Sequence, residues 1–246
     1  MVNAKSGPIG LTSVQIGQYD RSSFSQKTIW RTILTGAAEL GVRGKRTRER
    51  LVVSGFSLSI KNGVASVSLD DILRYSEVKK GAFYYYFETK EQFIKACFEE
   101  CYLKPVSDAF AEFEKNEANS TEDILHFFTT FTSKVKEKMD ARLGEHAVEL
   151  EDVFSNIAYM SRQDNFMAGH FLEFHEKQRE FVESCLVRMR DRGEVADGVD
   201  CAEMASMMCC CREGALTMSS RGMDMDFETV MAGFMRHFVQ LLAGPR

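Results

Sequence analysis

Apolar side chains recur along most of the chain at steps of three and four residues, as on a helix with one buried face. The pattern is clear at Phe127, Phe131 and Val135. No segment alternates apolar and polar residues in the way of a half-buried strand, and no internal repeat of about 20 to 50 residues is visible. The pattern therefore predicts an all-α fold.

Capping residues and helix breakers divide this pattern into separate helices. Ser68, Thr89 and Ser120 stand where N-caps are expected. Pro105 removes a backbone donor, so we expect it to kink or interrupt its helix. The predicted helices cover residues 47–61, 68–76, 79–86, 89–113, 120–135, about 144–161, 165–192, 201–218 and 227–241.

The N-terminal residues 1–42 show little periodicity. They predict either a flexible arm or, from Lys27 to Leu40, a short extra helix. The next residues, Val42 to Arg46, are basic and interrupted by Gly44, which favours a flexible entry into the first domain.

The composition is that of an ordinary globular protein, with 44% hydrophobic and 27% charged residues in 246. No apolar run approaches the roughly 18 residues of a membrane span, and no signal-peptide pattern is visible. The seven cysteines are odd in number and three are consecutive, which argues against a disulfide scaffold. We therefore expect a cytoplasmic protein that does not contact membranes.

Charge is distributed unevenly along the chain, although the net charge is −5. Residues 43–101 hold 11 Lys and Arg against 8 Asp and Glu, whereas residues 102–246 hold 16 against 26. A mildly basic head on an acidic body suits a protein that contacts a polyanion at one end only.

The stretch from Ser68 to Lys90 reads as two short helices joined by a tight turn and followed by the capped start of a third. A helix that enters the major groove of DNA must approach the backbone closely, which Gly81 allows. Three consecutive tyrosines span nearly a full turn, so they cannot all face a core. The alternative is that the three tyrosines form a buried aromatic cluster. Phe83 and Phe87, four residues apart, fit the inward face.

Residues 47–93 resemble the DNA-binding domain of TetR/AcrR-family transcriptional regulators. The resemblance is carried, in order, by TRERL, NGV, SLDDIL, VKKGAFYYYF and ETKEQF. It implies a three-helix head with a helix-turn-helix at 43–90 and a helical-bundle domain for effector binding and dimerisation at 91–246. The expected DNA contacts, from the resemblance and from local charge, are Arg46, Arg48, Ser68, Lys79, Lys80, Gly81, Ala82, Tyr84, Tyr85 and Lys90. The basic residues before Leu51 could equally form a solvated face.

Two positions depart from the family pattern. Asp70 is acidic where a basic or neutral residue is more usual, and Tyr85 replaces the more frequent histidine. Both bear on which operator is bound.

The body contains candidates for an effector pocket. Inward-facing aromatics favour an apolar or aromatic effector, and the candidates are Cys97, Cys101, Phe110, Phe127, Phe128, Phe131, Phe171 and Phe174. The alternative is that these aromatics are simply core. Cys97 and Cys101 share a helix face, so a redox or electrophile sensor is a rival function.

Neither metal-ligand spacing nor a nucleophile–base arrangement is visible, so we expect no cofactor, no metal and no enzymatic activity. A helical enzyme or a small-molecule carrier remains the rival from another class.

The last two predicted helices carry heptad-like seams of soft apolar residues suited to close helix packing. The family implies that they pair with a second subunit, and a dimer on a palindromic operator compensates for the weak grip of one short helix. The expected interface residues are Met204, Met208, Cys211, Ala215, Met218, Met231, Phe234 and Phe238. A sensor role for this Met/Cys seam is the alternative.

Together these features predict a homodimeric, ligand-responsive regulator, most simply a repressor. The family resemblance further implies that the effector shifts the helix that joins head and body, and Pro105 would let the two halves of that helix move separately.

Overall fold

The computed structural model describes residues 41–115, 118–163, 165–220 and 226–243 of the chain. The chain divides into two compact units, residues 1–45 and 46–246. Only residues 41–45 of the first unit are described, and the arrangement below concerns the second unit. The short helix expected from Lys27 to Leu40 lies outside the described residues.

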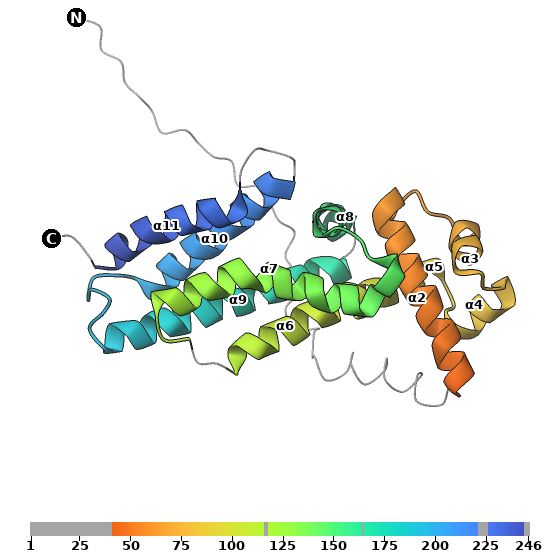
Figure 1. The fold of residues 1–246 in the computed structure, drawn as a ribbon, viewed down its shortest axis with the longest axis horizontal. Helices are drawn as coiled ribbons and strands as arrows, with labels where there is room; N and C mark the ends of the chain where they lie inside the picture. Colours follow the sequence, from red (N-terminus) through yellow and green to blue (C-terminus); the bar gives the residue numbers. More distant parts are fainter. Residues whose placement is uncertain (1–40, 116–117, 164, 221–225, 244–246) are drawn as a thin grey trace, which may run out of the picture. The chain divides into compact units, whose positions relative to one another are not determined.

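Helices follow one another through the described residues, and no strand occurs among them (Figure 1). The head contains α2 (Val42–Asn62), α3 (Leu69–Ser76) and α4 (Lys80–Tyr86), and α5 (Lys90–Phe98) connects it to the body. The body contains α6 (Lys104–Glu114), α7 (Thr121–Leu143), α8 (Leu150–Gln163), α9 (Asn165–Asp191), α10 (Cys201–Ser220) and α11 (Phe227–Leu242). The all-α prediction is confirmed.

The predicted caps form as the sequence indicates. Ser68 caps α3 in a capping box with Asp71, and Ser120 caps α7 in the same way with Asp123. Thr89 caps α5 by accepting a hydrogen bond from the backbone N–H of Gln92 at 3.1 Å.

The start of α2 differs from the expectation. The helix begins at Val42, so the residues expected to be a flexible entry, Val42 to Arg46, are helical. Lysine and arginine are good helix formers, and a single glycine costs only about 1 kcal/mol, so Gly44 does not end the helix.

Pro105 interrupts the α-helix as predicted, but the chain stays helical around it. The α-helix ends at Phe98, a π-helical turn, η2, covers Glu99–Leu103, and α6 begins at Lys104 with Pro105 in its first turn. The residues before Pro105 keep helical φ and ψ, so the helix is continuous, and the wide π turn accommodates a residue that cannot donate a hydrogen bond to the preceding turn. The extra residue of the π turn changes which faces of α5 and α6 are aligned.

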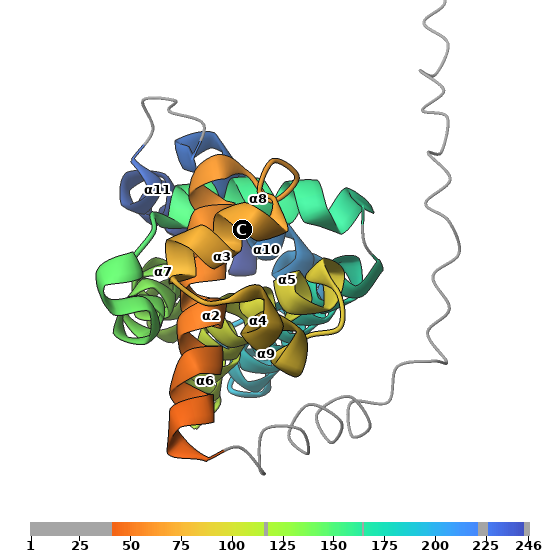
Figure 2. The ribbon, with the colours of Figure 1, turned by 90° about the vertical axis from the view of Figure 1, so that its right-hand side faces the viewer.

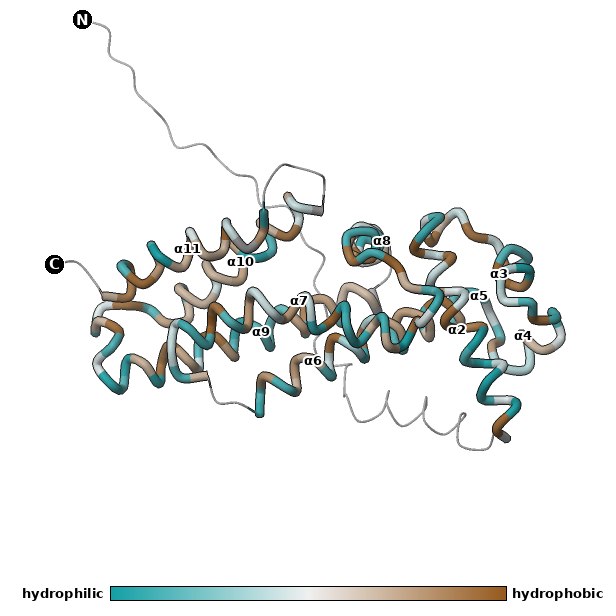
Figure 3. Tube along the Cα trace, viewed as in Figure 1, coloured by the Kyte–Doolittle hydropathy of each residue, from teal (hydrophilic) through white to brown (hydrophobic). Residues whose placement is uncertain are grey.

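The body helices pack around an apolar core. α9 packs against α8 and α10, α6 against α7, and α11 against α7 and α10. Figures 1 and 2 both show α8 running across the direction of α7. Along the body helices hydrophobic and hydrophilic positions alternate at short intervals (Figure 3), as expected when one face of each helix is buried.

Candidate nucleic-acid interface and the helical body

Helix α4 presents one face to the core of the head and the other to solvent. Phe83 and Phe87 are buried and pack against Phe93 of α5, with ring centroids 5.3 and 5.0 Å from that ring. This aromatic cluster holds a helix of only seven residues in place. Tyr84 and Tyr85 point the other way, with 52% and 72% of their surfaces exposed. The prediction that the tyrosines are not a buried cluster is confirmed for these two.

The beginning of α4 combines positive charge with an open surface. Lys79 and Lys80 are exposed, and so is Gly81. A Cβ atom added at Gly81 would have no heavy atom within 4 Å. Packing among the described residues therefore does not require a glycine at this position, and the open surface leaves room for another molecule to approach the helix closely.

The turn before α4 fixes the angle between α3 and α4. Glu77 adopts a left-handed conformation with φ of 54°, and the N–H of Val78 donates to the carbonyl of Leu73 at 3.1 Å. This is the six-to-one bond of a helix C-cap. Ser68, at the start of α3, has its hydroxyl engaged in the capping box and remains exposed.

Two of the predicted DNA contacts are engaged inside the chain. Arg48 pairs with Glu100 at 2.6 Å and lies 5.3 Å from the ring centroid of Phe87. The ammonium of Lys90 donates to the carbonyl of Val67, just before α3. Both side chains therefore hold elements of the head together, and only Arg46 of the two predicted arginines is exposed.

A network of charges joins the head to the body. Glu100 of η2 accepts from Arg48 of α2 and, at 3.0 Å, from Arg142 of α7, and Arg142 also pairs with Glu49 of α2. Two basic residues thus share one half-buried carboxylate at the junction. The head is fastened to α7 by ion pairs that the sequence pattern does not reveal.

A second junction involves α8. The side-chain amide of Asn156 donates to the carbonyl of Ile60 at 3.2 Å and accepts from the N–H of Val64 at 3.3 Å. Ile60 lies near the end of α2, and Val64 lies in the segment that leads to α3. One side chain of the body therefore satisfies two backbone groups of the head.

The predicted pocket aromatics mostly form a solid core. Phe110, Phe127, Phe128 and Phe131 are buried and in ring contact with one another or with neighbouring aromatics. Phe174 stacks on Phe131 at 5.6 Å, whereas Phe171 is exposed and contacts His175. Phe110, Phe127, Phe128 and Phe131 therefore match the alternative prediction, that these aromatics belong to the hydrophobic core.

Cys97 and Cys101 are both buried and both carry free thiols. Burial raises the pKa of the Cys97 thiol far above its usual range, and burial raises that of Cys101 to about 12. Because the thiolate is the reactive form, both thiols are poor nucleophiles where they stand. Among the described residues, no group of three or more His, Cys, Asp or Glu side chains could hold a metal ion.

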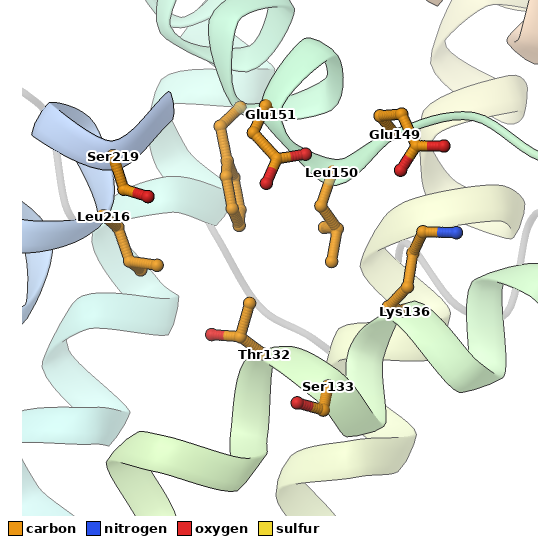
Figure 4. A pocket seen from close by; sticks show the side chains of 9 residues that line it. Thr132, Ser133, Lys136, Glu149, Leu150, Glu151, Leu216 and Ser219 are labelled. Carbon is orange, nitrogen blue, oxygen red and sulfur yellow. The ribbon is translucent and has the colours of Figure 1, made fainter. Parts of the chain in front are cut away.

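A hollow of about 370 Å³ lies between α7, α8 and α10 and contains none of the predicted pocket residues. Figure 4 shows Leu150 of α8 directed towards α7, across from Thr132, with Leu216 of α10 at the side. Lys136, Glu149 and Glu151 make part of the rim polar. Sequence periodicity could not find this hollow because it forms where three helices diverge.

Two polar side chains of the body, those of Arg212 on α10 and Gln178 on α9, are buried. Arg212 is 3% exposed, pairs with Glu213 at 2.6 Å, and lies over the rings of Phe128 and Phe131 at 5.9 and 5.7 Å. Gln178 of α9 is fully buried. The signal in the sequence was an arginine within an apolar run, at Cys209-Cys210-Cys211-Arg212, which the helical pattern alone does not interpret.

The expected dimer seam is largely intramolecular. Met208, Ala215, Met231 and Phe238 are buried within one chain, so they cannot contact a partner, which corrects the prediction for these four. Met204, Cys211 and Phe234 are half-buried, and Met218 is exposed. The seam residues pack α10 and α11 against each other and against neighbouring body helices, because a 3.5-residue pattern does not distinguish a partner in the same chain from one in another.

Within the part of the chain that the structure describes, no helix is long and apolar enough to cross a membrane.

Comparison with known proteins identifies the head. The family model described as bacterial regulatory proteins, tetR family, matches residues 51–97. The HTH-type transcriptional repressor NemR of Escherichia coli is 33% identical over 82 residues, which cover 33% of this chain and 41% of NemR. The transposon Tn10 TetC protein of Escherichia coli is 39% identical over 56 residues, which cover 23% of this chain and 28% of TetC. The matches thus span less than half the length of these relatives.

Solved structures share the fold well beyond the head. The reduced form of Escherichia coli NemR superposes with a TM-score of 0.55 at 20% identity, covering 81% of this chain and 100% of that one. A TetR-family regulator from Cytophaga hutchinsonii gives 0.62 at 15% identity, covering 85% and 100%. At these identities the similarity shows the fold alone. The family match therefore assigns residues 51–97 to the tetR family of bacterial regulatory proteins, and the solved structures show that head and body together share the fold of TetR-family regulators.

Proposed function

We propose that the protein is a homodimeric DNA-binding transcriptional repressor that a small apolar or aromatic effector releases from a palindromic operator. The observation that carries this proposal is the outward face of α4, where Tyr84 and Tyr85 are exposed. The same end of the helix carries exposed Lys79, Lys80 and Gly81. In this assignment the head is residues 43–90 and the body residues 91–246. A function on DNA also places the protein in the cytoplasm.

The contacts divide into two kinds. Tyr84, Tyr85, Gly81 and Ala82 lie on the helix that would enter the major groove, so they would contact base edges. Lys79, Lys80, Ser68 and Arg46 would contact phosphates. Arg48 and Lys90 act indirectly, since their charged groups already bind Glu100 and the Val67 carbonyl.

The second subunit would bind the outer face of α10 and α11. Met207 and Met218 are exposed on α10 and lie three turns apart, so they share one side of the helix. Val239 and Leu241 are exposed on α11 as well, but two residues apart they point to different sides of that helix. Unlike the inward seam, the side of α10 that carries Met207 and Met218 is available to a partner, and exposed apolar side chains are common at interaction sites.

The test is a selection of bound fragments from genomic DNA, followed by affinity measurements on the selected site at several salt concentrations. Lys80→Ala should weaken binding to all sequences alike and lower the salt slope by about 1, because one phosphate contact is lost. Tyr85→Ala should change the preferred bases and leave the slope as it is. Tyr159→Ala, an exposed tyrosine of α8, is the control for both.

The same measurements test the dimer. Sedimentation should show two chains per duplex, and Met218→Glu should give a monomer whose operator affinity is at least about tenfold lower, since a palindrome rewards two linked heads. If the wild type selects no preferred sequence, or if Tyr85→Ala selects the same site as the wild type, the proposed interface is wrong.

The rival functions have weaker support. A redox or electrophile sensor through Cys97 or Cys101 would need a thiol that ionises, whereas burial keeps both protonated. A helical enzyme or carrier would place the activity in the body, and it would leave the exposed face of α4 without a role.

A further inference from the structure

The body contains buried hydrogen-bonding groups that its own fold does not satisfy. Neither atom of the Gln178 side-chain amide has a hydrogen-bond partner among the described residues, although the residue is fully buried. The same holds for Nε of Arg212 and Nε2 of His175. Buried polar groups are paired in the great majority of cases, so a cluster of exceptions calls for a cause.

Arg212 is only partly neutralised by its neighbours. One terminal nitrogen pairs with Glu213, and the other reaches the Thr132 hydroxyl at a long 3.4 Å. Its remaining N–H is directed at no acceptor in the described part of the chain. A guanidinium offers five donors in a planar fork, so this one retains capacity for a further oxygen.

The surroundings of Arg212 are aromatic and lie next to open space. The guanidinium is placed over Phe128 and Phe131, and Phe131 stacks on Phe174. Thr132, which Arg212 contacts, also lines the hollow between α7, α8 and α10, and Leu216, one turn beyond Arg212, lines it as well. Thr132 therefore separates the hollow from the guanidinium of Arg212.

Helix α9, which packs against α10, contributes the buried Gln178 one turn after Phe174 and His175. His175 lies 4.0 Å from Glu213, so the polar groups of α9 and α10 meet at this level of the body. Burial lowers the pKa of His175, which favours the neutral ring. A neutral imidazole and an amide bind a polar group without adding charge.

We propose that this part of the body binds a small organic molecule with an aromatic or apolar frame and one acceptor oxygen, a carboxylate or a carbonyl. Arg212 and Gln178 donate to that oxygen, and the rings of Phe128, Phe131 and Phe174 contact the frame. The inference names the effector class of the function proposed above and depends on that function for its regulatory meaning. Binding itself needs no DNA.

Three matched probes test it on the full chain by thermal unfolding: benzoate, acetophenone and ethylbenzene. They differ in carrying a carboxylate, a neutral carbonyl or no oxygen. Benzoate or acetophenone should raise Tm in a dose-dependent way, and ethylbenzene should not. A rise with benzoate alone identifies the ligand group as an anion, and a rise with acetophenone alone identifies a neutral carbonyl.

The variants Gln178→Met and Arg212→Met should bind the effective probe at least tenfold more weakly. Arg179→Met, on the adjacent residue with a half-exposed ion pair, is the control and should bind as the wild type does. A rise that survives in both variants, an equal rise with ethylbenzene, or no rise with either oxygenated probe would overturn the proposal.

The unliganded variants give an independent readout. Gln178→Met keeps the volume and removes an amide that has no partner in the described chain, so its Tm should equal or exceed that of the wild type. If the amide of Gln178 had only a structural role, its removal would lower Tm, and that outcome would contradict a role in ligand binding. Because none of these measurements uses DNA, a failure here is separate from a failure of operator binding.

Discussion

Single residues in this chain depend on what surrounds them at the junction of head and body. Glu99 and Glu100 are neighbours in η2 but meet different environments. Glu100 is bound by Arg48 and Arg142. Burial, and then the adjacent charge of Glu100, raises the pKa of Glu99 to about 7. The raised pKa means that the folded chain holds a proton there that the unfolded chain releases.

Replacing Glu99 by Gln should therefore change the pH dependence of stability. Between the unfolded pKa, about 4.5, and the folded value of about 7, the native state binds more protons than the unfolded state, so wild-type stability falls as pH rises. Thermal unfolding should give similar Tm values for wild type and Glu99→Gln at pH 4.5 and a higher Tm for the variant at pH 8.

The control for this experiment is Glu180→Gln, which removes one negative charge from an exposed position of α9. A Tm difference between Glu99→Gln and wild type that is the same at both pH values would contradict the assigned pKa.

At the level of elements, the position of helix α4 depends on how α2 packs against α5. Gly55 of α2 faces the ring of Phe93, which in turn supports Phe83 and Phe87 of α4. A Cβ at Gly55 would lie 2.2 Å from the Phe93 ring and 3.4 Å from the Cys97 sulfur. The close approach of the two helices therefore requires a glycine.

Gly55→Ala should lower the free energy of unfolding by roughly 1–3 kcal/mol, because the added methyl overpacks the core and displaces the Phe93 ring. Chemical denaturation measures this directly. Gly81→Ala is the matched control, since open space surrounds that position and alanine favours the helix. An unchanged stability of Gly55→Ala would show that α2 and α5 can separate without cost.

On the scale of the whole described unit, polar contacts connect head and body, and two of these junctions involve buried or half-buried groups. One is the ion-pair network of Glu100 with Arg48 and Arg142, and the other is the clamp of Asn156 on Ile60 and Val64. Helix α8 carries this clamp and also lines the hollow with Leu150 and Phe154. One helix thus contacts both the candidate effector region and the segment that leads to α3.

Asn156→Leu should loosen the head without unfolding the body. The N–H of Val64 and the carbonyl of Ile60 lose a partner, which should cost about 1–2 kcal/mol and speed amide exchange at Val64 and in α3. Hydrogen exchange followed by mass spectrometry measures this. Ser155→Ala, the exposed neighbour on α8, should exchange like wild type. Unchanged protection of the α2–α3 segment in Asn156→Leu would exclude the clamp.

Local signals in the sequence predicted most of the helices and which side chains of α4 face outward. Helix period, the capping serines and Thr89, and the spacing of Phe83 and Phe87 act between residues a few positions apart, so they are visible without tertiary structure. They predicted α3, α4 and the outward tyrosines. The family resemblance then connected that head to DNA.

The tertiary structure alone decided which groups distant in sequence meet. Arg48 has Glu100 as its partner, the seam at Met208 faces its own chain, and Arg212 is buried over Phe128 and Phe131. The sequence does not show whether a basic residue pairs with a phosphate or with a carboxylate of its own chain, or whether an apolar residue packs against another subunit or its own core. These contacts depend on how the helices pack across the whole chain. The sequence pattern named Phe128, Phe131 and Phe174 as pocket candidates, but Arg212 and Gln178 could be found only from burial and unsatisfied hydrogen bonds.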